Sequence, residues 1–111
     1  MTSSNYIVEV SIQARRDTKE AVFYKKELGT REDNLDKFKE DLAKEIQRLK
    51  TSPKVGANLS SRMDIETSLK YLPVQDYLLF YEILEDKKQV DVIRLLPAKT
   101  NWMSKIMKSI D

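Results

Sequence analysis

The sequence predicts an α+β fold in which a mainly antiparallel sheet is covered on one face by a helical hairpin. Three observations indicate this fold class. A strand pattern opens the chain, and two helical patterns follow it directly. Three further strand patterns come in succession. A short amphipathic pattern lies at the C-terminal end. Because consecutive strands joined by short turns usually pair with each other, the last three are expected to form an antiparallel meander.

The first strand is expected over residues 6–12, where apolar and polar side chains alternate. Such alternation is typical of a half-buried strand, with one face formed by Tyr6, Val8, Val10 and Ile12. A helical spacing replaces the alternation over 14–28, where Phe23 and Tyr24 are expected to widen a thin apolar stripe. Gly29 then offers the left-handed conformation that ends many helices.

The second helix has the clearest pattern in the chain. Charged residues surround a single apolar stripe formed by Leu35, Phe38, Leu42, Ile46 and Leu49. Thr30 is expected to cap this helix, with Asp33 three residues later completing a weak capping box. Because the link between the two helices is short, they are expected to lie antiparallel to each other.

The second half of the chain is dominated by strand patterns. Residues 50–64 are rich in turn formers and are expected to form a loop. Strand character returns near Ile65, and Pro73 is expected to mark either the end of that strand or a bulge. Two strong strand patterns follow over 76–84 and 89–96, with a charged turn between them.

The C-terminal pattern predicts a short amphipathic helix. Its apolar residues recur at helical spacing: Trp102, Met103, Ile106, Met107 and Ile110. Thr100 or Asn101 can cap this helix. Trp102 is the only tryptophan in the chain and is expected to anchor the helix on the sheet.

The composition excludes many kinds of site. The chain has 111 residues and a net charge of +2, with neither cysteine nor histidine. A thiolate nucleophile, a Cys/His zinc site and a Ser-His-Asp triad are therefore excluded. No apolar run approaches the roughly 20 residues that span a bilayer, and the N-terminus lacks the pattern of a secretion signal. We expect a single cytoplasmic domain over 1–111, without a metal, a cofactor or a membrane contact.

The order of these patterns and several local motifs resemble the RelE/ParE superfamily, the toxins of type II toxin–antitoxin modules. The first strand is followed by Ala14 and then an acid, Asp17, as in the family. A loop motif with the family's spacing is formed by Leu49, Pro53, Gly56 and Leu59. The most specific match is the segment from Leu72 to Trp102, which contains the paired tyrosines of the central strand, Tyr77 and Tyr81, and then Arg94.

The resemblance implies a growth-inhibiting toxin, of the kind that also stabilises plasmids, bound to a cognate antitoxin in a hetero-oligomer. The ribosome-dependent RNases of the superfamily carry several basic residues before the tyrosine strand. They add an Arg after the last strand and often a Tyr or His near the C-terminus. Here only Lys70 precedes the tyrosine strand, Pro73 stands where those enzymes tend to carry an Arg, and Lys99 is alone after the last strand. The sequence motif at this point is nearer that of the ParE branch, whose characterised members poison DNA gyrase.

The resemblance suggests three sets of candidate residues. Weak candidates for catalysis are Lys70, Arg94 and Lys99. Candidates for the toxic face are Lys70, Tyr77, Tyr81, Arg94, Lys99 and Trp102. Candidates for antitoxin binding, on the apolar edges of the helical hairpin, are Val22, Leu28, Phe38 and Leu42.

Each candidate also has a structural interpretation. The tyrosines and the tryptophan are typical of core packing, and the cations are typical of solvated strand ends. Arg94 has the strand parity of Val90, Val92 and Leu96, so its stem is expected to be partly covered and its head to pair with an acid.

Three functions remain open from the sequence. The first is a ParE-like toxin that poisons gyrase. The second is a RelE-like mRNA endoribonuclease that acts on the ribosome and uses Lys70, Arg94 and Lys99 with a non-standard acid. The third is a non-toxic, degenerate member that only binds an antitoxin. The small number of basic residues argues against strong nuclease activity.

Overall fold

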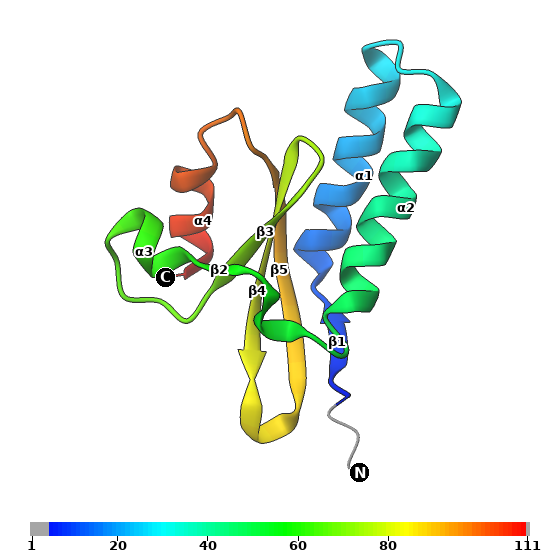
Figure 1. Cartoon of the computed structure of the whole chain (residues 1–111). Helices are drawn as coiled ribbons and strands as arrows, with labels where there is room; N and C mark the ends of the chain where they lie inside the picture. The colour runs from blue at the N-terminus through cyan, green and yellow to red at the C-terminus, as the bar shows by residue number, and fades with distance from the viewer. Residues whose placement is uncertain (1–4, 111) are drawn as a thin grey trace.

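The computed structural model describes residues 5–110, which form one five-stranded sheet and four α-helices (Figure 1). The strands are β1 (Ile7–Val10), β2 (Ala57–Asn58), β3 (Lys70–Val74), β4 (Tyr77–Leu84) and β5 (Gln89–Pro97). The helices are α1 (Ile12–Glu27), α2 (Glu32–Arg48), α3 (Leu59–Met63) and α4 (Trp102–Ile110). None of the helices in this part of the chain is both long and apolar enough to cross a membrane.

The strand order across the sheet is β1-β5-β4-β3-β2. The expected meander is confirmed, because β3, β4 and β5 pair antiparallel in sequence. The first strand pairs with β5 in parallel, so the first and the last strand of the chain are neighbours in the sheet. This pairing places α1 directly beside the C-terminal half of β5.

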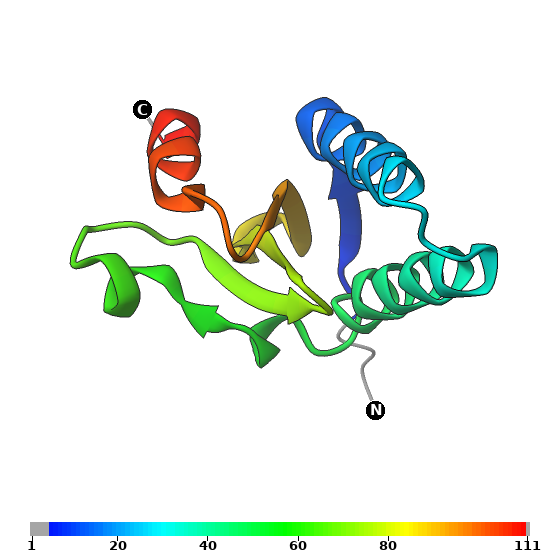
Figure 2. The same cartoon turned by 90° about the horizontal axis from the view of Figure 1, so that it is seen from above.

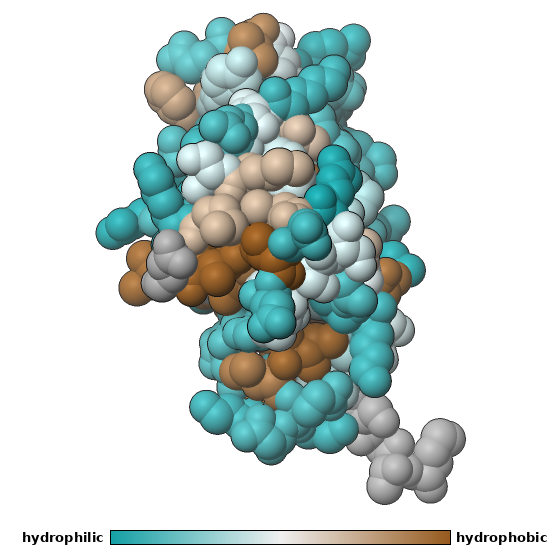
Figure 3. Space-filling model, turned by 90° about the vertical axis from the view of Figure 1, so that its left-hand side faces the viewer, coloured by the Kyte–Doolittle hydropathy of each residue, from teal (hydrophilic) through white to brown (hydrophobic). Residues whose placement is uncertain are grey.

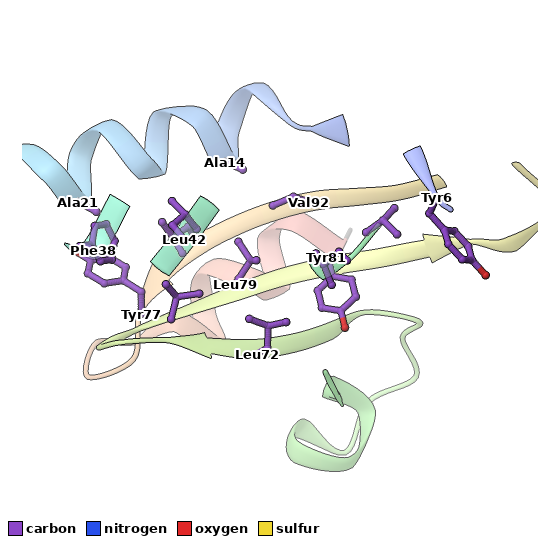
Figure 4. Packing of buried hydrophobic residues seen from close by; sticks show 14 residues of the cluster. Tyr6, Ala14, Ala21, Phe38, Leu42, Leu72, Tyr77, Leu79, Tyr81 and Val92 are labelled. Atoms are coloured by element: carbon purple, nitrogen blue, oxygen red, sulfur yellow. The ribbon is translucent and has the colours of Figure 1, made fainter. Parts of the chain in front are cut away.

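Helices cover both faces of the sheet (Figure 2). The expected helical hairpin of α1 and α2 packs on one face, where Figure 4 shows Phe38 and Leu42 of α2 pointing toward Tyr77 and Leu79 of β4. The other face carries a second apolar cluster that includes Leu59 of α3 and residues of α4. The sheet is therefore the middle layer between two cores.

Helix α1 begins earlier than the sequence pattern predicts. Ser11 is its N-cap, and the Ser11 hydroxyl accepts a hydrogen bond from the Ala14 N–H at 2.9 Å. Ile12 was expected on the inner face of the first strand, but it is the first helical residue and 71% exposed. The cap at Ser11 therefore begins the helix before Ile12, the last apolar residue of the alternating pattern.

The link between α1 and α2 also differs from the expected capping box. Gly29 adopts a φ of 79°, as expected, and its N–H donates to the Lys26 carbonyl oxygen. The Thr30 N–H donates to the Lys25 carbonyl oxygen at 3.0 Å, which completes a Schellman motif at the end of α1. Because Thr30 belongs to this C-terminal motif, Arg31 becomes the N-cap of α2 and makes no side-chain cap.

The segment expected as a loop contains short regular elements. A 3₁₀ turn at Pro53–Val55, the two-residue β2 and the five-residue α3 all lie between 50 and 64. Strand β3 begins at Lys70 rather than near Ile65, and it ends one residue after Pro73. Strand β2 pairs only with the first two residues of β3, so the sheet edge is open beside Pro73 and its missing N–H is tolerated.

Candidate functional site

A cleft of about 330 Å³ lies between α1, the C-terminal half of β5 and α4. Its charged residues are Asp17 and Glu20 of α1, Arg94 of β5 and Lys105 of α4. Its aromatic and apolar wall includes Ala21, Tyr24, Tyr77 and Pro97. Helix α1 thus meets β5 and α4, which are far from it in the sequence, around one open site.

The centre of this cleft is an ion pair between Arg94 and Asp17. Arg94 Nε donates to Asp17 Oδ2 at 2.8 Å, and Nη2 donates to Oδ1 at 3.1 Å. The Leu95 N–H and the Gln13 amide also donate to the carboxylate, whose side chain is only 3% exposed. The third guanidinium nitrogen, Nη1, donates to Ser109 Oγ of α4. The expectation that Arg94 pairs with an acid is confirmed, and this pair ties β5 to both α1 and α4.

A bulge in β5 gives Arg94 its direction. Arg94 pairs with Phe80 and Val92 pairs with Tyr81, so Ile93 is an extra residue between two cross-strand pairs. The expectation that Arg94 shares a face with Val90 and Val92 is therefore wrong, whereas Arg94 and Leu96 do share a face. Val90 and Val92 face the helical hairpin, whereas Arg94 points between α1 and α4.

The three cations proposed for catalysis do not come together. Lys70 shares the hairpin face of the sheet with its cross-strand partner Tyr81, and its Nζ donates to the Gly56 carbonyl oxygen and to Asn58 Oδ1. Arg94 lies on the side of α4. Lys99 is exposed in the turn that follows the end of β5. Two of these cations hold neighbouring segments together, and the third is solvated.

Tyr81 has a structural role in the segment before β2. The ring is buried, and its hydroxyl donates to the Pro53 carbonyl oxygen at 2.7 Å and accepts from the Gly56 N–H at 2.9 Å. A Cβ added at Gly56 would lie 2.5 Å from this hydroxyl oxygen, so only glycine permits the approach. Burial raises the pKa of Tyr81, which keeps the phenol protonated at neutral pH.

Replacing Tyr81 with phenylalanine is expected to cost about 1–3 kcal/mol of unfolding free energy, since the buried Pro53 carbonyl and Gly56 N–H both lose their partner. Urea denaturation followed by circular dichroism measures this change. Tyr71→Phe is the control, because the Tyr71 hydroxyl has only a 3.5 Å contact with Arg62 at the surface. Equal stability of the two variants would contradict the structural role of the Tyr81 hydroxyl.

Tyr77 and Trp102 occupy opposite faces of the sheet. Tyr77 packs against Phe38 with ring centroids 5.4 Å apart, and burial raises the pKa of its phenol. Trp102 is 4% exposed and packs against Phe80 at 5.4 Å in the α4 core. The expectation that Trp102 anchors the last helix on the sheet is confirmed. Helix α4 begins at Trp102, so Asn101 rather than Thr100 directly precedes it, and the Thr100 hydroxyl donates to the Pro97 carbonyl oxygen.

The residues expected to bind an antitoxin divide into two groups. Phe38 and Leu42 are buried in the core beneath the hairpin. Val22 is half-buried, and Leu28 is exposed near the hairpin tip. Only the second pair is available at the surface.

Other exposed apolar side chains were not among the candidate site residues. Phe23 and Tyr24 were expected to widen the stripe of α1, but they are 64% and 58% exposed. Figure 3 shows apolar surface on the side of α3 and α4, where Met103 and Met107 are exposed. The exposure of Phe23 could have been predicted from the sequence, because Phe23 lies about opposite Ala14 and Ala21 on a helical wheel.

Asp17 was noted in the sequence only as part of the family motif. Its position, three residues after Ala14 and four before Ala21, places it on the buried side of α1. An acid in that position requires a buried cation or several N–H donors. The spacing of Asp17 from Ala14 and Ala21 could therefore have identified Asp17 as a buried acid in need of a partner.

Comparison with known proteins identifies the family. The family model of the ParE toxin of the type II toxin–antitoxin system parDE matches residues 8–102, from β1 to the first residue of α4. The chain belongs to the ParE toxin family. No curated protein matches the sequence.

Two solved structures share the ParE fold of this chain. One is from the chromosomal ParDE toxin–antitoxin system of P. aeruginosa, with a TM-score of 0.69 and 13% identity, over 87% of this chain and 100% of that chain. The other is from the toxin–antitoxin complex RelBE2 of Mycobacterium tuberculosis, with a TM-score of 0.56 and 17% identity. That match covers 84% of this chain and 98% of the other.

Proposed function

We propose that this ParE-family toxin inhibits growth in the cytoplasm by poisoning DNA gyrase and that a cognate antitoxin neutralises it. The observation that carries this proposal is the family match, which extends from residue 8 to residue 102 and covers the sheet except for Ile7, the first residue of β1. Gyrase is the proposed target because the match is to the ParE branch of the superfamily, whose characterised members poison gyrase.

The positions of the basic residues support a target other than mRNA. Cleavage by a 2′-hydroxyl requires a base, positive charge at the crowded phosphate and an acid for the leaving oxygen. The Lys70 ammonium is engaged by Gly56 and Asn58, and Arg94 is neutralised by Asp17. A phosphate placed against Lys70, on the hairpin face of the sheet, would not meet Arg94, which lies on the side of α4.

The antitoxin is the proposed protein partner. The RelBE2 structure is a complex of a toxin with its antitoxin, and the P. aeruginosa structure belongs to a ParDE system. Both share the fold of this chain. A toxin of this fold with exposed apolar residues on two sides has surface available for such a partner.

Induction of the chain without its antitoxin is expected to stop growth, with filamentous cells and DNA damage. Purified chain is expected to trap gyrase on cleaved DNA, which gel electrophoresis of plasmid DNA detects as linear product. Lys99→Ala and Lys70→Ala test two of the three candidate cations of the toxic face. Lys87→Ala, in the exposed turn between β4 and β5, is the matched control.

Other results would select the remaining functions. Growth arrest with loss of translation and mapped mRNA cuts, abolished by Lys70→Ala or Lys99→Ala, would identify a ribosome-dependent RNase. Normal growth after induction of the folded chain would identify a degenerate member that only binds its antitoxin.

A further inference from the structure

The α1 wall of the cleft between α1, β5 and α4 presents an unpaired carboxylate beside an aromatic ring. Glu20 and Tyr24 lie four residues apart on α1, so they are neighbours on one face of the helix. Both line the cleft, and Tyr24 is 58% exposed. Within residues 5–110 Glu20 forms no ion pair. Its carboxylate is therefore available to a group that enters the cleft.

The hydroxyl of Tyr77 is a second unpaired polar group in the cleft. Tyr77 is only 4% exposed, and it lines the cleft beside α1. The Tyr81 hydroxyl bonds to Pro53 and Gly56, whereas the Tyr77 hydroxyl has no hydrogen-bond partner in the described part of the chain. Every fully buried polar side-chain atom in that part does have one. The Tyr77 hydroxyl must therefore reach the surface of the cleft, where a bound group can meet it.

Negative charge surrounds this hydroxyl. Burial raises the pKa of the Tyr77 phenol, and Asp76, Tyr24 and Glu20 raise it further through their charges. Asp76 is neutralised by Lys25 at 3.1 Å, and the Lys25 ammonium nitrogen lies 5.3 Å from the centre of the Tyr77 ring. Glu20 has no such cation within residues 5–110. The α1 side of the cleft thus keeps one uncompensated negative charge.

The opposite wall of the cleft carries a positive charge. Lys105 of α4 lines the cleft and, within residues 5–110, pairs with no carboxylate, Glu20 included. Between the two walls, the Arg94 guanidinium is neutralised by Asp17. The cleft therefore has an acidic side and a basic side above a neutral floor. Its volume of about 330 Å³ lies at the lower end of the range of small-molecule sites.

We propose that the cleft binds a ligand with a guanidinium or ammonium group at one end and a carboxylate at the other. The cationic group pairs with Glu20, donates to the Tyr77 hydroxyl oxygen and packs on the Tyr24 ring. The carboxylate pairs with Lys105. Arginine and lysine have this chemistry as free amino acids, and a basic residue beside an acidic one has it within a partner protein. The site lies beyond the proposed function, because neither gyrase nor the antitoxin enters its assignment or its test.

Ligands of other charge fit this cleft less well. An apolar ligand would take Glu20, Lys105 and the Tyr77 hydroxyl out of water without replacing their hydrogen bonds. A phosphate or a dicarboxylate would pair with Lys105 but would bring a second negative charge toward Glu20. Only a ligand with both charges satisfies the two walls together.

Titration of the full-length chain with L-arginine, followed by amide chemical shifts in NMR spectra, tests the acidic side. The Kd is expected to be on the order of 1 mM, since both ion pairs are open to water. Glu20→Gln is expected to raise this Kd about tenfold through loss of a charge-assisted hydrogen bond, and Tyr77→Phe about threefold through loss of a neutral one. Glu27→Gln is the matched control and is expected to keep the wild-type Kd, because Glu27 is exposed on the same helix but does not line the cleft.

Lys105→Ala tests the other end of the ligand. It is expected to weaken L-arginine about fivefold and to leave agmatine, which lacks the carboxylate, unchanged. Lys108→Ala, exposed on α4 outside the cleft, is the control. The capped dipeptide acetyl-arginyl-glutamyl-amide separates the two sources of the ligand. If it binds at least as tightly as L-arginine, the groups belong to a partner protein, and if only L-arginine binds, the ligand is a free amino acid.

Three results would overturn the proposal. The first is an equal Kd for L-arginine in Glu20→Gln and the wild type. The second is the absence of shifts at the cleft amides with about 20 mM L-arginine, well above the expected Kd. The third is tighter binding of L-glutamate than of L-arginine, which would assign the cleft to anions. Tyr77→Phe is expected to keep the wild-type melting temperature, because its hydroxyl has no partner among residues 5–110, so a changed Kd reports on the site. The proposed function stands whichever result is found.

Discussion

Arg94→Ala is expected to lower the free energy of unfolding by about 3–5 kcal/mol, as when one partner of a buried ion pair is removed. The pair is largely covered, with side-chain exposures of 16% for Arg94 and 3% for Asp17. Without the guanidinium, the Asp17 carboxylate keeps only the Leu95 N–H and the Gln13 amide as donors. The helix α4 also loses its contact from Arg94 to Ser109.

Urea denaturation measures this loss, and Lys37→Ala is the matched control. Lys37 pairs with Asp41 at 2.7 Å, but its side chain is 61% exposed, so its removal is expected to cost less than about 1 kcal/mol. The double variant Asp17→Asn/Arg94→Met removes both charges and is expected to be more stable than Arg94→Ala. A stable Arg94→Ala protein that has lost toxicity would instead assign Arg94 to the toxic face.

Trp102→Ala is expected to cost about 3–5 kcal/mol, the usual range for removing a large buried aromatic ring. The indole fills the space between α4 and the sheet, in contact with Phe80 and with Tyr71 at a centroid distance of 6.4 Å. The Arg62 guanidinium also lies 5.5 Å from its ring. Only Ile106 among the other residues of α4 is buried, so the helix depends on Trp102 for its attachment.

Amide hydrogen exchange distinguishes detachment of α4 from general unfolding. In Trp102→Ala the amides of α4 are expected to exchange much faster than those of β4, which remain protected by the hairpin core. Trp102→Phe is the control and is expected to retain most of the protection. Uniform loss of protection across the sheet in Trp102→Ala would contradict a role restricted to α4.

The elements that the sequence predicts well are those set by local patterns. The stripe of α2 and the strand pairs of the meander arise from neighbouring residues, and both are confirmed. The short elements between 50 and 64 had no such signal, because two to five residues are too few to establish a period. The Tyr81 hydroxyl and the contacts of Gly56 hold this segment, and neither is visible without the fold.

The candidate site was harder to predict because it depends on non-local geometry. Arg94 was wrongly placed on the same face as Val90 and Val92, because the order of apolar residues does not reveal the bulge at Ile93. Asp17 and Arg94 are 77 residues apart in the chain, so the sequence indicates that each needs a partner but does not name it. Lys70 and Lys99 belong to one set in the linear motif, but Lys70 lies opposite Tyr81, whereas Lys99 follows the end of β5 that pairs with Tyr77.

The parallel pairing of β1 with β5 has a consequence for synthesis of the toxin. Strand β5 is the last strand made, yet it lies between β1 and β4 and supplies the floor of the cleft. A nascent chain that ends before Gln89 has no neighbour for β1 and no partner for the buried Asp17. Since the ribosome adds residues in order, the toxin fold forms only after β5 has emerged. A cell therefore exposes no finished toxin surface until β5 has emerged from the ribosome.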